Sequence, residues 1–189
     1  MRAVSFDVGV LNLAFVVAEI DGPQVRVLSW RNVRVAESAK APKQELVCAV
    51  LRALSEHDDL LECGTVLIES QPRFSPLNVH VAHAIASFFW LRKRIDLDEA
   101  VDVHFVHASL KNTYCSPHAG ERKRGVTARY AKYDAYKRGA VSACEALVAG
   151  TALEPTWRAF KKRDDAADCL MQLLAWRRVP FADVRLSAP

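Results

Sequence analysis

Hydrophobic residues in the first fifth of the chain fall into continuous runs rather than helical spacing. Runs at residues 3–8, 13–20 and 25–35 are rich in Val, Phe and Ile, and they predict three strands. Asn12 separates the first two runs, and the Asp-Gly-Pro turn at 21–23 separates the second and third. Three strands joined by such short turns are expected to pair as an antiparallel meander.

The rest of the chain alternates between helical spacing and short apolar runs. Helical spacing predicts helices over residues 42–57 and 75–94, a third that ends near Val148 and a last one over 164–178. Apolar runs at 65–70 and 101–108 predict two further strands. The order β-β-β-α-β-α-β-α-α predicts an α/β fold, with one mixed five-stranded sheet flanked by helices. No internal repeat or change of composition divides the chain, so we expect one domain over residues 1–189.

Composition excludes several classes of protein. The 189 residues are 51% hydrophobic, but no apolar run reaches the length of about 18 residues that a membrane span needs. No secretory signal pattern opens the chain. We therefore expect a soluble, intracellular protein without membrane contact; a viral replication site, the nucleus and the mitochondrion are not distinguished. The five cysteines form no Cys-x-x-Cys pair, which favours reduced thiols over disulfides or zinc.

Positive charge is concentrated in one segment. The whole chain has a net charge of +4, whereas residues 111–138 contain eight basic and two acidic residues, a net charge of +6, together with all four tyrosines. Basic residues interleaved with aromatics predict nucleic-acid contact. The alternative is a solvated helix face with its tyrosines packed on the core. The predicted DNA-binding residues are Lys111, Arg122, Lys123, Arg124, Arg129, Lys132 and Lys137.

Carboxylates interrupt three of the apolar segments. Asp7 lies inside the first strand, where Asp is disfavoured and an unpaired buried charge costs several kcal/mol or more. Glu69 ends the fourth strand, and Asp165 and Asp168 share one face of the last helix. A helix cap would explain Asp164, but not the others. A divalent cation would neutralise acids that otherwise repel, and oxygen-only ligands favour Mg²⁺ or Mn²⁺ over zinc.

Three blocks carry a resemblance to a known family: "SFDVGVLNLAF", "VLIESQPRFSPLNVHVAHAIASFFW" and "KKRDDAADCLMQLLAW". Together they resemble the signature blocks of the RuvC-type Holliday junction resolvases, in particular the branch of poxviruses, other large DNA viruses and fungal mitochondria. The resemblance implies a ribonuclease H-like fold whose first three strands are antiparallel. It also implies that Asp7, Glu69, Asp165 and Asp168 bind metal, with Lys111 as a catalytic lysine.

The implied function is a structure-selective endonuclease. It would resolve four-way DNA junctions by paired symmetric nicks, through phosphodiester hydrolysis that depends on two Mg²⁺ ions, with Mn²⁺ as a substitute. Its partner would be branched double-stranded DNA. Apolar residues surround the predicted helix 76–91, so we expect a homodimer through this helix, which Phe88→Asp or Phe89→Asp would break. The alternative is a helix sandwiched within one monomer.

Three other functions compete with this interpretation. A ribonuclease H acting on RNA–DNA hybrids would keep the acids but need no dimer. A non-catalytic protein that binds branched DNA would not need all four acids. Actin-like and sugar-kinase ATPases share the expected fold, but they need Gly-rich phosphate loops that the seven glycines of this chain do not form.

Overall fold

The computed structural model describes residues 1–38, 40–112 and 126–189, although the side chains of residues 126–134 lie outside that description. The strands are β1 (Arg2–Val8), β2 (Asn12–Asp21), β3 (Gln24–Arg34), β4 (Thr65–Glu69), β5 (Asp102–Val106) and β6 (Arg185–Ser187). The longer helices are α1 (Lys43–Ser55), α2 (Pro76–Phe89), α4 (Val126–Val148), α5 (Glu154–Ala159) and α6 (Arg163–Arg177). Short turns of helix are η1 (Asp58–Leu60), η2 (Trp90–Asp96), η3 (Ala108–Leu110) and η5 (Phe181–Asp183).

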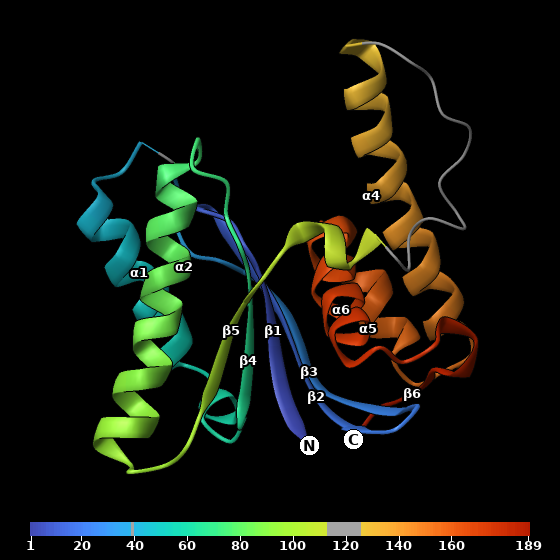
Figure 1. The fold of residues 1–189 in the computed structure, drawn as a ribbon, viewed down its shortest axis with the longest axis horizontal. Coiled ribbons are helices and arrows are strands. Elements are labelled where there is room, and N and C mark those ends of the chain that lie inside the picture. Colours follow the sequence, from blue (N-terminus) through green and yellow to red (C-terminus); the bar gives the residue numbers. More distant parts are fainter. Residues whose placement is uncertain (39, 113–125) are drawn as a thin grey trace.

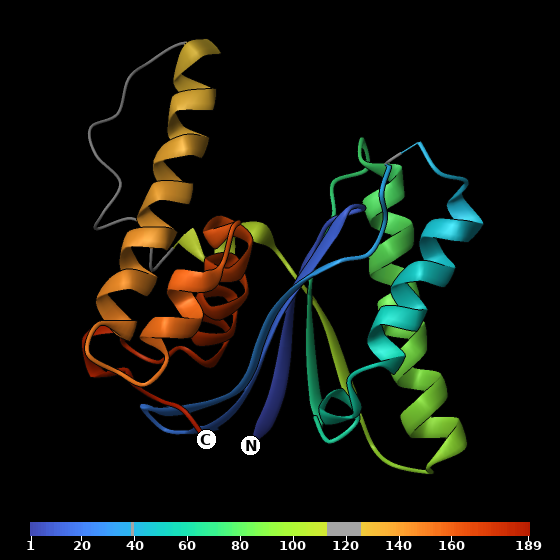
Figure 2. The same ribbon diagram turned by 180° about the vertical axis from the view of Figure 1, so that it is seen from behind.

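The strands form one mixed sheet in the order β5-β4-β1-β2-β3-β6. Helices α1 and α2 cover one face, and α4, α5 and α6 cover the other (Figure 1). The view from behind shows the same three layers, with the N-terminal half of α4 extending beyond the body (Figure 2). None of the helices among the described residues combines the length and hydropathy that crossing a bilayer requires.

The predicted strand pairing is confirmed, but the strand number is not. β1, β2 and β3 pair antiparallel, and β1–β4 and β4–β5 pair parallel. The prediction of five strands is wrong, because β6 adds a sixth strand parallel to β3. Only three residues of β6 pair with β3, too few for a visible pattern in the sequence. Helix α5 was also missed, since six residues with a proline near the start give no helical period.

The two faces of β1 separate the hydrophobic core into two clusters. Val4, Phe6 and Val8 lie in the cluster beneath α1 and α2, while Ala3 lies in the cluster beneath α6. Successive side chains of a strand point to opposite faces, so Asp7 shares the α6 face with Ala3. The fold therefore places the carboxylate of β1 under α6.

Helix α6 is the helix that is buried on all sides. All its residues from Ala166 to Ala175 except Asp168 are buried, because the sheet covers one side and α4 and α5 the other (Figure 1). Two hydrogen bonds fix it to the sheet: Trp30 Nε1 donates to the Ala166 carbonyl at 3.1 Å, and Gln172 Nε2 donates to Ser5 Oγ at 3.0 Å. Gln172 lies one turn after Asp168 and Ser5 lies two residues before Asp7, so this bond sets the height of Asp168 relative to Asp7.

The prediction that Phe88 and Phe89 of α2 lie in a dimer contact is wrong. Phe88 and Phe89 are 6% and 0% exposed and pack in the monomer's own core, so Asp at either position would disrupt folding rather than report on a dimer. Exposed apolar side chains lie further along, in η2 and directly after it. They are Trp90, Leu91, Ile95 and Leu97, between 44% and 72% exposed.

The cysteines among the described residues form no disulfide with one another. They are Cys48, Cys63, Cys144 and Cys169. Cys115 lies outside the described residues.

The Gln172–Ser5 bond leads to a prediction about stability. Gln172→Ala leaves the Ser5 hydroxyl without its side-chain partner and opens space in the core. We expect the free energy of unfolding to fall by about 1–3 kcal/mol, measured by urea denaturation. Gln44→Ala, on the exposed side of α1, is the matched control and should change it by less than about 0.5 kcal/mol. Equal effects of the two substitutions would contradict this role for Gln172.

Candidate active site

Parallel pairing of β1 with β4 brings the first two acids together. Phe6 pairs with Ile68, so the next residues, Asp7 and Glu69, come side by side at the ends of the two strands. Glu69 lies close enough to Asp7 to raise the pKa of the Asp7 carboxyl. The sequence prediction that these two acids meet is therefore consistent with the register of the sheet.

Helix α6 supplies the third acid. Asp168 stands one turn into the helix, on the side that faces β1, and its side chain is only 14% exposed. Its charge acts on Asp7, and the charge of Glu69 acts on it. The three acids thus come from β1, β4 and α6, and long-range folding brings them into one cluster.

Lys111 joins this cluster from the segment after β5. His107 begins the η3 turn, where its Nδ1 accepts a hydrogen bond from the Ser109 backbone N–H at 3.2 Å. The turn directs Lys111 back toward the sheet. Its Nζ donates to Asp168 Oδ2 at 2.5 Å and to Glu69 Oε2 at 3.3 Å. The predicted lysine therefore lies between two of the predicted acids.

Burial and charge shift the pKa values of these groups in ways that fit a cation site. Burial raises the pKa of Asp7 well above its ordinary value; the Lys111 charge opposes this, and Glu69 adds to it. Burial also raises the pKa of Asp168, again opposed by Lys111. Desolvation works against the charged form of Lys111, but Asp168, Glu69 and Asp7 together raise its pKa. One ammonium thus only partly offsets three crowded carboxyl groups.

Asp165 lies at the margin of the cluster. Its Oδ2 is 3.5 Å from Asn32 Nδ2 on β3 and 3.5 Å from Lys162 Nζ, and its side chain is 18% exposed. Among the described residues, its recorded polar contacts are thus to β3 and to the start of α6 rather than to Lys111. Asp165 remains a predicted metal ligand on the grounds of its helix position relative to Asp168.

Asp164 does not cap α6, although a helix cap was the explanation that the sequence offered for it. The N-cap residue is Lys162, and the Asp164 carboxylate instead accepts from Lys137 Nζ on α4 at 2.6 Å. Although burial acts in the opposite direction, this hydrogen bond and the Lys137 charge lower the pKa of Asp164. The pair links α4 to α6 and leaves Asp164 outside the acidic cluster.

The donor set suits a hard divalent cation. Asp7, Glu69 and Asp168 offer only carboxylate oxygens, the ligands that Mg²⁺ and Mn²⁺ prefer. As the side chains lie, no three His, Cys, Asp or Glu residues in the described part of the chain are arranged as a metal site. Glu69 and Asp168 instead both face the Lys111 ammonium. The cluster could hold a metal if Lys111 turned its ammonium toward substrate.

The predicted DNA-binding residues are only partly within the structure. Lys111 and Lys137 are described, and both are ion-paired. Arg122, Lys123 and Arg124 lie outside the described residues, as do the side chains of Arg129 and Lys132. Their role stays a prediction.

Sequence reasoning missed residues whose importance comes from the tertiary structure. Asn32 reaches Asp165 only because β3 lies beneath α6, and Gln172 looks like one more polar residue in a helix. Phe74 is a residue that could have been singled out from the sequence. It is a lone aromatic in the polar loop after Glu69, and it is 85% exposed.

Comparisons with known proteins agree with this architecture. The fowlpox virus resolvase, solved with its substrate Holliday junction DNA, has a TM-score of 0.64 at 16% identity, covering 94% of this chain and 97% of that one. The yeast mitochondrial Holliday junction resolvase Ydc2 has a TM-score of 0.62 at 16% identity, covering 96% and 81%. Thermus thermophilus RuvC has a TM-score of 0.60 at 14% identity, covering 94% and 96%. These likenesses confirm the predicted ribonuclease H-like resolvase fold.

A match of sequence goes beyond the fold. No relative among curated proteins matches the chain. Residues 1–112, more than half of the 189, match the family described as Poxvirus A22 protein. This match includes Asp7, Glu69 and Lys111 but ends before α6. The chain therefore belongs to the Poxvirus A22 protein family.

Proposed function

We propose that this protein is a structure-selective endonuclease that resolves four-way DNA junctions by metal-dependent hydrolysis of phosphodiester bonds. The observation that carries the proposal is the meeting of Asp7, Glu69 and Asp168 around Lys111, at the ends of two parallel strands and the start of α6. Three crowded carboxyl groups that one ammonium only partly offsets destabilise the fold, and a bound cation would neutralise their charge. The similar proteins of known structure are Holliday junction resolvases, which favours a branched DNA substrate.

The residues have separate tasks in this proposal. Asp7, Glu69 and Asp168, with Asp165 at the margin, would hold two Mg²⁺ ions, or Mn²⁺ in their place. When bound, the ions supply a Lewis acid and an activated water for attack on phosphorus. Lys111 donates hydrogen bonds to the phosphate oxygens as negative charge develops on them. The burial of these groups excludes bulk water, which strengthens each electrostatic interaction.

Two cuts related by symmetry require two sites related by symmetry. We propose that the protein is a homodimer, and that the exposed apolar residues of η2, with Leu97 directly after it, form the contact. Lys93 anchors η2 to the monomer, because its buried ammonium donates to the Leu61 carbonyl at 2.5 Å and pairs with Glu99 at 2.9 Å. The apolar residues beside it are thus presented on a fixed backbone. A C2 dimer would then present two active sites to the two continuous strands of a junction.

The substrate is tested by one nuclease assay in Mg²⁺ with a four-way junction, a linear duplex and an RNA–DNA hybrid of the same sequence. We expect paired symmetric nicks in the junction and far slower cleavage of the other two. Preferred cleavage of the hybrid would establish the ribonuclease H alternative. Junction binding without any cleavage would establish the non-catalytic alternative.

Substitution of the acids should separate binding from cleavage. Asp7→Asn, Glu69→Gln and Asp168→Asn each remove one ligand charge with little change of volume. We expect cleavage in Mg²⁺ to fall by several orders of magnitude, because the lost charge serves the transition state. Junction affinity in EDTA should stay the same or rise, because less negative charge faces the DNA.

Asp164→Asn is the matched control for this series, because its carboxylate pairs with Lys137 outside the cluster. It should keep most activity, while Asp165→Asn should lose it. Near wild-type cleavage by Asp7→Asn would refute the metal site. An inactive Asp164→Asn with an active Asp165→Asn would mean that Asp164, and not Asp165, is the metal ligand.

The acidic cluster should make stability depend on pH when no divalent cation is present. Burial keeps protons on Asp7 and Asp168 in the folded state at a pH where the unfolded chain has lost them. Stability is therefore highest below the unfolded pKa values and is lost as the pH rises through the raised pKa values of the folded state. The raised pKa of Lys111 acts only at strongly alkaline pH.

We expect the free energy of unfolding in EDTA to fall as the pH rises above about 4, the ordinary pKa of Asp, measured by urea denaturation. Asp7→Asn should flatten this dependence and increase stability on the alkaline side of it. Mg²⁺ should restore the stability of the wild type but add little to the variant. An unchanged pH dependence in Asp7→Asn would show that Asp7 does not titrate as proposed.

Charged substitutions in the proposed contact should disrupt the dimer. Leu91→Asp and Ile95→Asp place charge on exposed apolar positions, so the monomer should still fold. Light scattering should give twice the monomer mass of 21.1 kDa for the wild type and the monomer mass for both variants. Ser55→Asp, an exposed position on neighbouring α1, should leave the dimer intact. A monomeric wild type would refute the dimer and leave the nuclease proposal standing.

A further inference from the structure

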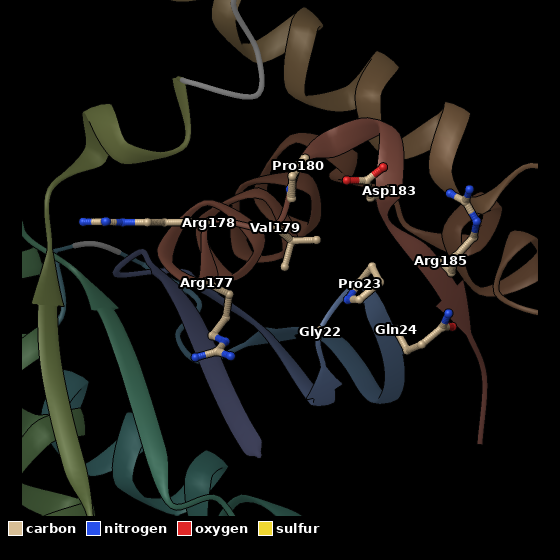
Figure 3. Close-up of a pocket in the computed structure, with 9 residues that line it drawn as sticks. All are labelled: Gly22, Pro23, Gln24, Arg177, Arg178, Val179, Pro180, Asp183 and Arg185. Carbon is tan, nitrogen blue, oxygen red and sulfur yellow. The ribbon is translucent and has the colours of Figure 1, made fainter.

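A pocket opens at the far end of α6 from the acidic cluster. Its volume is about 520 Å³, and it lies where α6 ends beside the turn between β2 and β3 (Figure 3). Arg177 and Arg178 come from the end of α6, and Arg185 comes from the start of β6. Asp183 is the one acid in the lining, so three arginines and one aspartate leave an excess of two positive charges.

The three arginines carry charge that the protein does not neutralise. All three are exposed, and in the described part of the chain none forms an ion pair with a carboxylate. Arg185 instead donates from Nη1 to the carbonyls of Ala182 and Val184, each at 3.0 Å, which orients its guanidinium. By contrast, Arg26 on the neighbouring strand β3 is paired with Glu19. Free arginines in a pocket indicate an anionic partner.

The arrangement of the side chains excludes a small anion held by all three. Figure 3 shows the guanidinium groups of Arg177, Arg178 and Arg185 pointing in three different directions from the pocket. A single phosphate could contact one of them at a time. Several phosphates of one DNA strand can each contact a different arginine.

Two aromatic side chains lie between Arg177 and the edge strand β5. The Trp176 ring lies 5.3 Å from the ring of His104 on the edge strand β5, and the Arg177 guanidinium carbon lies 6.0 Å from it. β5 leads through His107 and η3 to Lys111. Basic and aromatic groups along one path are typical of surfaces that follow a nucleic-acid backbone.

The length of α6 sets the spacing along the DNA. Asp168 and Arg177 are nine positions apart, which gives about 14 Å along the helix axis. An extended arginine side chain adds several ångströms, and duplex DNA rises about 3.4 Å per base pair. The pocket therefore lies about four to six base pairs from a phosphate held at the acids.

We propose that Arg177, Arg178 and Arg185 form a second DNA-contact surface, which binds the backbone of one junction arm about four to six base pairs from the point of cleavage. This inference rests on the proposed function, because it takes branched DNA as the substrate. It assigns the pocket to positioning an arm rather than to chemistry.

The test combines protein and DNA variants in gel-shift titrations at several salt concentrations in EDTA. The protein is wild type or the triple variant Arg177→Gln, Arg178→Gln, Arg185→Gln. Arg52→Gln, an exposed arginine of α1 on the other side of the sheet, is the control. The junction carries charge-neutral methylphosphonate linkages either about four to six or about ten to twelve base pairs from the crossing point.

We expect the triple variant to lose affinity and to have a salt dependence flatter by about two to three units, one for each lost phosphate contact. Near methylphosphonates should weaken binding by the wild type but not by the triple variant, and far ones should affect neither. Arg52→Gln should behave as the wild type.

Three results would overturn the inference: an unchanged salt dependence, a triple variant still sensitive to near methylphosphonates, or equal effects of near and far linkages in the wild type. Thermal unfolding checks that the triple variant is folded, and Arg→Lys at the same three positions should restore affinity. Failure of the wild type to bind or cut junctions at all would instead refute the proposed function, so the two failures are distinguishable.

Discussion

The crowding of three carboxyl groups around one lysine is the constraint on which the rest of this structure depends. Asp7, Glu69 and Asp168 are drawn from distant parts of the chain, and Lys111 lies within 3.3 Å of two of them. Like charges at such a site raise the free energy of the folded state. The fold must therefore hold the acids in place through contacts made elsewhere, in the sheet and along α6.

Those contacts are found immediately behind the cluster. The parallel register of β1 and β4 fixes two acids, and the Gln172–Ser5 bond fixes the third relative to them. α6 is surrounded by core residues, so its position is set by packing on every side. The same helix carries Asp168 near one end and Arg177 at the other. Its length therefore sets the distance between the acidic cluster and the proposed second DNA contact.

Much of this could be predicted from the sequence because the signals were local. Asp7 interrupts an apolar strand, and the Val-Leu-Ile-Glu run ends at Glu69, so both acids stood out without knowledge of the fold. The crossover pattern placed their strands in one sheet. Lys111 could be proposed only by resemblance, because the η3 turn that directs it toward Asp168 has no strong pattern of its own.

The features that could not be predicted depend on which elements of the fold pack against each other. Helical spacing shows that α2 and α6 are rich in apolar residues, but not that α4 and α5 cover α6 while part of α2 and η2 stays exposed. Phe88 and Phe89 were therefore assigned to the wrong side of the helix. β6 and the Asp164–Lys137 pair escaped for the same reason, since each exists only through contact with a remote element.

The central claim is that the carboxyl cluster binds metal, and that the Lys111 ammonium bonds to Asp168 and Glu69 only when no metal is bound. Crystals soaked in Mn²⁺ test this directly through anomalous difference density. The account predicts density between Asp7, Glu69 and Asp168, with the Lys111 ammonium moved away from Asp168, and no such density in Asp7→Asn. A cluster without Mn²⁺ at saturating concentration, with Lys111 still bonded to Asp168, would contradict it.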